Sequence, residues 1–160
     1  MRAKRKGKGI VALLFLLSLL LTGCGGQKSV SDYAERLKRE VALPLGVWYS
    51  DEAEMWEEGF LDESLCRALF GQADIKAESY RVFLCTEGES ICEIALVSMP
   101  TRAEAERLSA FLSARLSFLQ KTAKENGFDA LDDGFVVQRG RCVLYVAAEN
   151  AAFILSCLSV

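Results

Sequence analysis

Histidine is absent from all 160 residues of the chain. Histidine is the commonest side-chain metal ligand and a frequent general base, and it activates the nucleophile in Ser-His and Cys-His pairs. Its absence argues against enzymes built on those pairs and against histidine-ligated metals. Enzymes that work with carboxylates or lysine remain open.

Recognisable cofactor motifs are missing as well. The 6 cysteines contain no C-x-x-C pair, and without histidine their spacings match no zinc site. No glycine-rich phosphate-binding loop is present either. We therefore expect neither a cofactor nor a metal.

The beginning of the chain has three parts that together form a secretory signal. Five basic residues come first, and an apolar run from Ile10 to Leu21 follows, interrupted only by Ser18. Leu21-Thr22-Gly23-Cys24 then resembles the bacterial lipobox, in which the cysteine is acylated and the preceding peptide is removed. We predict a signal peptide over 1–23, a lipidated Cys24 with a flexible tether over 24–30, and anchoring at the outer face of the bacterial cytoplasmic membrane.

Two other interpretations of this segment are weaker. A transmembrane anchor needs about 20 apolar residues, and this run stops short of that at a Gly-Cys-Gly-Gly cluster. An ordinary cleaved signal would place Cys24 at the cleavage point by accident. Two acyl chains on the modified cysteine would instead give stable anchoring.

Charge changes when the signal is removed. The whole chain has 19 basic and 22 acidic residues, and residues 1–23 hold five of the basic ones. The remaining 14 basic and 22 acidic residues give a net charge of −8. An acidic domain is a poor partner for nucleic acid or for anionic membrane surfaces, so we expect no nucleic acid. Residues 31–160 have the usual length of a single domain.

Helical and strand patterns alternate along this domain. We predict a helix from Asp32 to Ala42 capped by Ser31, a short helix from Glu63 to Phe70 closed by Gly71, and a helix in the tail 149–158. Thr101-Arg-Ala-Glu104 is a capping box for a long helix that runs to about Glu125.

Two hairpins separate these helices. Strands are expected over 79–85 and 91–99, and again over 135–138 and 142–148 around the turn at Gly140. The stretch 45–58 is compatible with a strand or with a helical turn. The sequence therefore predicts an α+β fold, with a mostly antiparallel sheet of about four strands packed against the long helix, and short N- and C-terminal helices.

One arginine on the long helix interrupts an apolar stripe. At 100° per residue, Arg115 falls in the middle of a stripe formed by Leu108, Phe111, Leu112, Phe118 and Leu119. An unpaired buried charge is costly. Glu93 is the lone acid in the apolar strand 91–99, so we predict that Glu93 and Arg115 pair. This pair is either a structural contact, which we favour, or the polar floor of a ligand pocket.

Cys85 and Cys92 flank the first hairpin loop. They are candidates for a disulfide if the register places them opposite each other. The alternative, which we favour, is that the five cysteines beyond Cys24 are buried free thiols.

Residues 51–63 contain many acidic and aromatic side chains. The acids lack the spacing of a calcium loop, so we interpret them as a solvated surface. The aromatic residues are expected to belong to the core, although a partner-facing patch is an alternative. They are Trp48, Tyr49, Trp56 and Phe60.

These features resemble a family of small lipoproteins from Gram-positive anaerobes, catalogued as domain of unknown function 4358. The resemblance covers about residues 30–158 and is carried by Glu93-Ile-Ala-Leu96, by Arg115 within Ala114-Arg-Leu116, and by the Gly140-Arg-Cys-Val143 hairpin. The family has no established activity. The resemblance therefore implies location and fold but no catalytic residues.

Three functional hypotheses follow. The first is a non-enzymatic binding or accessory module tethered to the membrane by its lipid, with a protein partner or a small ligand. The second is a small hydrolase of cell-envelope material that uses Glu93 or the Asp129–Asp133 group as acid and base, which needs two carboxyls about 5–10 Å apart. The third is a redox protein that uses exposed, low-pKa thiols at Cys85 and Cys92.

Overall fold

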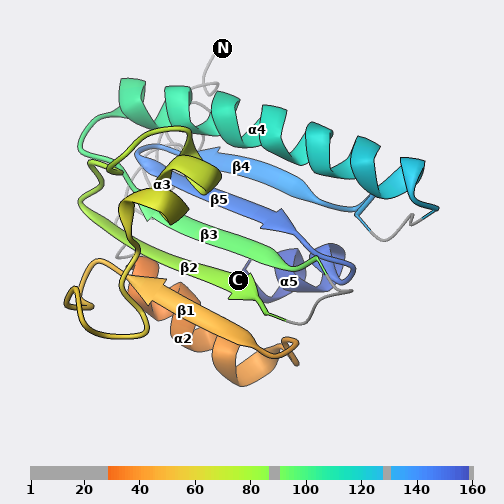
Figure 1. The fold of residues 1–160 in the computed structure, drawn as a ribbon, viewed down its shortest axis with the longest axis horizontal. Coiled ribbons are helices and arrows are strands. Elements are labelled where there is room, and N and C mark those ends of the chain that lie inside the picture. The colour runs from red at the N-terminus through yellow and green to blue at the C-terminus, as the bar shows by residue number, and fades with distance from the viewer. Residues whose placement is uncertain (1–28, 87–90, 128–130, 159–160) are drawn as a thin grey trace, which may run out of the picture.

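A computed structural model describes residues 29–86, 91–127 and 131–158 of the chain. Within them, five strands form one antiparallel sheet in the order β1-β2-β3-β5-β4 (Figure 1). The strands are β1 (Gly46–Ser50), β2 (Ser79–Cys85), β3 (Glu93–Ser98), β4 (Phe135–Arg139) and β5 (Cys142–Ala147). The predicted signal peptide, Cys24 and the tether as far as residue 28 lie outside the described residues.

Helices cover both faces of this sheet. They are α2 (Val30–Glu40), α3 (Glu63–Phe70), α4 (Arg102–Glu125) and α5 (Ala151–Leu158). The helices α3 and α4 pack on one face, and α2 and α5 pack together on the other (Figure 1). The predicted α+β class is confirmed. The sheet has one strand more than the four expected, because the ambiguous stretch 45–58 begins with β1.

The first helix begins earlier than expected. Ser29, not Ser31, is the N-cap, because its hydroxyl accepts a hydrogen bond from the amide of Asp32 and the Asp32 carboxylate accepts one from the amide of Ser29. This reciprocal capping places Val30, which we had assigned to the tether, inside the helix and in the core. The helix also ends at Glu40, short of the expected Ala42.

The other helix boundaries follow the sequence signals. Asp62 caps α3, and Gly71 closes it with a φ of +71°. Thr101 caps α4 by accepting a hydrogen bond from the amide of Glu104. Among the described residues, no helix combines the length and the apolar character that crossing a bilayer requires.

The central strand β3 explains how one sheet supports two cores. Its residues 94–97 are all buried, because alternate side chains enter the two cores on opposite faces. Among the described residues, the earliest core residue is Val30. A chain that begins at Gly25 therefore contains every residue of the described cores, and we expect it to fold.

The aromatic residues of 48–60 do not share one environment. Trp48 packs on Phe83 with ring centroids 5.4 Å apart. Trp56 is 78% exposed, so the expectation that it belongs to the core is wrong. The reason is local: Trp56 lies in the turn-rich loop between β1 and α3, where the residues on either side of it are also exposed.

Candidate functional site

Glu93 and Arg115 form a bidentate ion pair between the sheet and α4. The Arg115 Nε donates to Glu93 Oε2 at 2.9 Å, and a terminal guanidinium nitrogen donates to Oε1 at 2.6 Å. The Glu93 side chain is 17% exposed and the Arg115 side chain is 21% exposed. The contact predicted from the sequence is therefore present, and its parallel two-point geometry is the strong form of an arginine–carboxylate pair.

Two partners of this pair were not predicted. The Tyr145 hydroxyl donates to Glu93 Oε2 at 2.8 Å, and the other Arg115 terminal nitrogen donates to the Ala68 carbonyl of α3 at 2.6 Å. Tyr145 belongs to an apolar strand, where the pattern alone marks it as a core residue. Burial and the adjacent Glu93 charge raise the pKa of Tyr145. The hydrogen bonds that Arg115 donates to the Glu93 carboxylate raise the pKa of Arg115 above its usual value.

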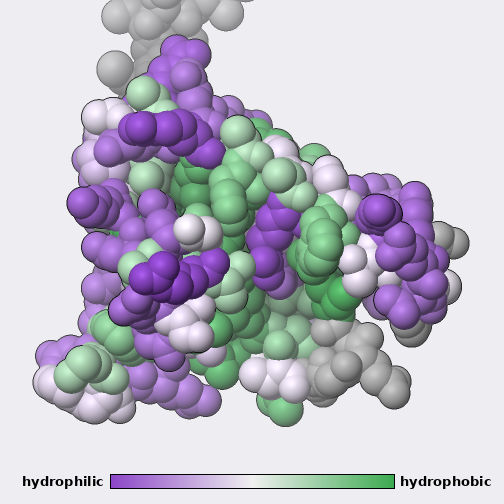
Figure 2. All heavy atoms as spheres, turned by 45° about the horizontal axis from the view of Figure 1, so that its top comes forward, coloured by the Kyte–Doolittle hydropathy of each residue, from purple (hydrophilic) through white to green (hydrophobic). Residues whose placement is uncertain are grey.

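The position of Arg115 on α4 differs from the expectation. The buried stripe of α4 is formed by Ala105, Leu108, Leu112, Leu116 and Ala123. Phe111 and Phe118, which we had placed in the stripe, are 39% and 65% exposed. Figure 2 shows hydrophobic residues gathered in the middle of the face seen there, with a small hydrophilic group among them and larger hydrophilic groups on either side. Arg115 therefore lies beside the buried stripe, where it reaches both Glu93 and α3.

The polar centre formed by Glu93, Arg115, Tyr145 and the Ala68 carbonyl joins four elements, β3, α4, β5 and α3, and leaves few groups for chemistry. A cavity of about 300 Å³ adjoins it, lined by apolar side chains together with Glu93 and Arg115. Within the described residues, however, the Arg115 guanidinium and the Glu93 carboxylate satisfy each other, and Tyr145 and Ala68 complete the contacts. We interpret the arrangement as a structural clamp that joins β3, β5, α4 and α3, although Glu93 and Arg115 also line the cavity.

Cys85 and Cys92 are opposed across the hairpin. The amide of Cys85 donates to the carbonyl of Cys92 at 2.9 Å, which continues the register of Leu84 with Glu93. Both cysteines are among the described residues, and the structure contains no disulfide between them.

The favoured expectation of buried thiols holds for Cys66, Cys92 and Cys157, whereas Cys85 and Cys142 are only half-buried. Burial raises the pKa of Cys92 to about 12. A redox or nucleophilic thiol needs the opposite shift, so the environment of Cys92 does not favour the redox hypothesis.

The acidic residues do not form a second centre. Asp51 and Glu52 pair with Arg81, a buried arginine of β2 that we did not predict, at 2.5 and 2.6 Å. Asp132 pairs with Lys124 at 2.9 Å, and Asp129 lies outside the described residues. In the part of the chain that the structure describes, no three Cys, Asp or Glu side chains gather as a metal site would require.

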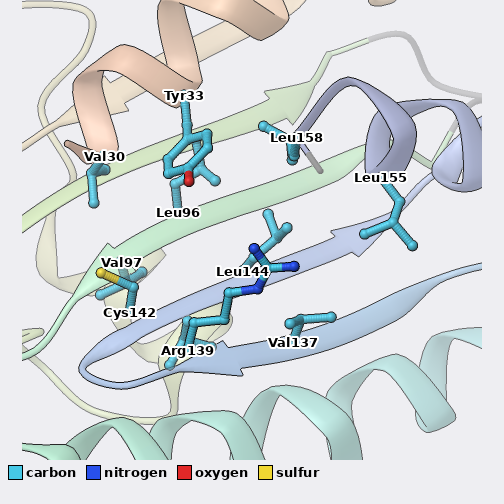
Figure 3. A pocket seen from close by; sticks show the side chains of 11 residues that line it. Val30, Tyr33, Leu96, Val97, Val137, Arg139, Cys142, Leu144, Leu155 and Leu158 are labelled. Atoms are coloured by element: carbon cyan, nitrogen blue, oxygen red, sulfur yellow. The ribbon is translucent and has the colours of Figure 1, made fainter. Parts of the chain in front are cut away.

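An apolar pocket lies on the opposite face of the sheet. It has a volume of about 210 Å³ and is bounded by the start of α2, the end of α5 and the strands β3, β5 and β4 (Figure 3). Its walls are almost entirely hydrophobic. The lining residues are Val30, Tyr33, Leu96, Val97, Val137, Arg139, Cys142, Val143, Leu144, Leu155 and Leu158.

Two polar groups accompany these apolar walls. Arg139, at the end of β4, is exposed, and its guanidinium reaches across the strands toward Leu144 (Figure 3). Tyr33 extends from α2 toward Leu96, with its hydroxyl at the pocket. Neither side chain has a hydrogen bond or an ion pair with another described residue. No local pattern in the sequence indicates this pocket, because its walls come from five separate elements.

Comparison of the chain with models of protein families found no match, and comparisons with curated proteins and with solved structures found none either.

Proposed function

We propose that this protein is a non-enzymatic binding module on the outer face of the bacterial cytoplasmic membrane, anchored through lipid on Cys24, and that its ligand occupies the apolar pocket. The observation that carries the proposal is the pocket itself: an apolar cavity with two polar side chains, Arg139 and Tyr33, that are not engaged by other described residues. Apolar walls with a few convergent polar groups are the usual composition of a small-molecule site.

The polar centre on the other face supports a binding module over a hydrolase. Carboxylate-dependent hydrolysis needs one acidic group to donate a proton while a second attacks or activates water. The Glu93 carboxylate accepts three hydrogen bonds from Arg115 and Tyr145. None of the described residues provides a second carboxylate in this centre, and the Asp132 carboxylate is paired with Lys124.

The anchor rests on the sequence, and the fold is compatible with it. The basic segment, the apolar run and Leu-Thr-Gly-Cys24 precede a domain whose first helix begins at Val30. Val30 lines the pocket, so the pocket lies close to the point where the tether joins the domain. We also propose that the chain belongs to the lipoprotein family that it resembles at Glu93, Arg115 and the Gly140 hairpin.

The test is to purify residues 25–160 from a bacterial host without detergent and to analyse the bound small molecules by mass spectrometry after solvent extraction. We expect one apolar compound in near-equal amount with the protein. Leu144→Trp, which places an indole in the pocket, should lack this compound while keeping the circular dichroism spectrum of the parent protein. Equal recovery from both proteins, or no compound from either, would contradict a role for the pocket.

A Cys24→Ala variant of the full chain tests the anchor separately. The parent protein should fractionate with membranes and incorporate labelled fatty acid. The variant should lose the label. Labelling that persists in the variant would contradict lipidation at Cys24.

A further inference from the structure

We propose that the ligand of the apolar pocket is a single-chain amphiphile with a carboxylate head, that is, a fatty acid. This inference rests on the proposed function, and it adds the chemical class of the ligand and the residues that recognise each end of it. Its apolar part is assigned to the walls contributed by α2, α5 and the sheet, and its head to Arg139 and Tyr33.

The walls fit a hydrocarbon chain. Val30 and Leu158 close the pocket from the two helices, while Leu96, Val137 and Leu144 come from three different strands (Figure 3). Transfer of each methylene group from water into such surroundings is worth about 0.8 kcal/mol. A polar ligand would gain little here, because Arg139 and Tyr33 are the only lining residues with long polar side chains among those described.

The size of the pocket favours one chain. At about 210 Å³, it falls below the range of roughly 300–1,000 Å³ that is usual for drug-sized ligands. A diacyl phospholipid needs room for two chains side by side. A single acyl chain, with its head at the opening, suits the smaller volume.

The head is assigned by charge. Among the described residues that line the pocket, Arg139 alone is charged. The domain as a whole is acidic, with 22 acidic against 14 basic residues after removal of 1–23. Arg139 is therefore a local positive charge on a protein of negative net charge, and it favours an anionic head group at this site. The planar guanidinium matches a carboxylate with two parallel hydrogen bonds, and the Tyr33 hydroxyl can donate a third.

The pocket lies close to the predicted lipid anchor, so the membrane would supply it with fatty acids. Ser29 is five positions after Cys24, and a fully extended chain over those five steps spans at most roughly 18 Å. With Cys24 anchored, Val30 and the pocket that it lines would stay close to the bilayer surface. Fatty acids partition into bilayers, so the tether would keep the pocket near its ligand.

The experiment measures binding of dodecyl-chain probes to residues 25–160 by isothermal titration calorimetry, below the micellar concentration of each probe. The probes are dodecanoate, dodecyl phosphate, dodecyl maltoside and dodecyltrimethylammonium. We expect dodecanoate to bind most tightly. Arg139→Gln should weaken dodecanoate by roughly 10- to 100-fold, the value of one charge-assisted contact, and should leave dodecyl maltoside unchanged.

A matched control is available on the same hairpin. Arg141 is two residues from Arg139, does not line the pocket and pairs with Glu78. Arg141→Gln removes the same charge at nearly the same place, so it corrects for long-range attraction. It should leave the dodecanoate affinity within about twofold of the parent value, because an exposed ion pair contributes little.

The outcomes separate the two proposals. If dodecyl maltoside binds as well as dodecanoate and Arg139→Gln has no effect, the carboxylate assignment is overturned while the pocket remains a binding site. If dodecyl phosphate binds more tightly through Arg139, the carboxylate assignment is also overturned, in favour of a phosphate head. If no probe binds, both this inference and the binding function of the pocket are overturned.

Discussion

Arg115 on α4 and Glu93 on β3, which are 22 residues apart in the chain, form a two-point ion pair at 2.9 and 2.6 Å. The pair holds the long helix to the centre of the sheet. The remaining guanidinium nitrogen of Arg115 donates a hydrogen bond to the Ala68 carbonyl of α3. Removal of one member of such a pair leaves a charge that is mostly buried and has lost its partner. That loss costs more than the intact pair contributes.

The first prediction concerns stability. Arg115→Met should lower the free energy of unfolding by about 2–4 kcal/mol, because Glu93 would remain partly buried without its cation. The measurement is urea denaturation followed by circular dichroism. Arg102→Met is the control on the same helix. Arg102 pairs with Glu106, both side chains are more than half exposed at 78% and 55%, and its removal should cost at most about 1 kcal/mol.

The double variant distinguishes a coupled pair from two independent residues. Arg115→Met combined with Glu93→Met should cost clearly less than the sum of the two single changes, because no charge is left unpaired. Additive costs would mean that the two side chains do not depend on each other, and the clamp would then be wrong.

The second prediction compares two acids that share one arginine. Asp51 and Glu52 both pair with Arg81, but their side chains are 29% and 73% exposed. Asp51 also accepts a hydrogen bond from the amide of Tyr80 at 2.9 Å. Asp51→Ala should therefore destabilise the protein by about 2–3 kcal/mol, and Glu52→Ala by less than about 1 kcal/mol, in the same urea measurement. Equal losses of stability in Asp51→Ala and Glu52→Ala would show that the greater burial of Asp51 and its hydrogen bond from Tyr80 do not add to stability.

The ion pairs show what a single sequence can reveal. Glu93 was found because a lone acid in an apolar strand needs a partner. Arg81 is a lone arginine in the apolar strand 79–85, so the same reasoning predicts that it is buried with an acidic partner. Tyr145 was not, because a tyrosine in an apolar strand is compatible with ordinary packing until its neighbours are known.

Features that depend on adjacent residues can be predicted from the sequence more reliably than features that depend on long-range packing. The turn at Gly140, the end of α3 at Gly71 and the cap at Thr101 depend on a few adjacent residues, and the structure confirms them. The start of α2 was missed by two residues because Ser29 and Ser31 are both reasonable caps, and burial of Val30 decides between them. The apolar pocket depends on how distant elements leave space between them, which no local pattern encodes.

The third prediction uses the two tryptophans of the chain. Trp56 is 78% exposed, whereas Trp48 is half-buried against Phe83. Iodide should quench the fluorescence of Trp56 and leave most of that of Trp48. Trp48→Phe should therefore give red-shifted, fully quenchable emission, and Trp56→Phe should give blue-shifted, protected emission. Protected emission in Trp48→Phe would contradict the exposure of Trp56.

The same two residues should differ in their effect on stability. Trp56→Ala removes few contacts and should change the free energy of unfolding by no more than about 0.5 kcal/mol. Trp48→Ala removes the contact with Phe83 and should cost about 2–3 kcal/mol. A large loss from Trp56→Ala would mean that Trp56 packs against the domain.

The fourth prediction concerns alkaline pH and Cys92. Burial raises the pKa of Cys92 from 9.0 to about 12. Between these two values the unfolded chain has lost a thiol proton that the folded protein retains, so unfolding releases a proton and stability falls as the pH rises. Between pH 9 and 10, Cys92 should account for a loss of about 1 kcal/mol. Below pH 8 its contribution to stability should be fully present and independent of pH.

Urea denaturation in the presence of reductant, from pH 7 to 10, measures this slope. Cys92→Ala should make the decline above pH 9 shallower by about 1 kcal/mol per pH unit. The residual slope is expected from Cys66, Tyr80 and Tyr145, whose pKa values are also raised by burial. Ile94→Val is the matched control, because Ile94 lies in the same core as Cys92 and its truncation lowers stability without removing a titratable group. If Ile94→Val and Cys92→Ala retained the same slope, the thiol of Cys92 would not be held in its protonated form by the core.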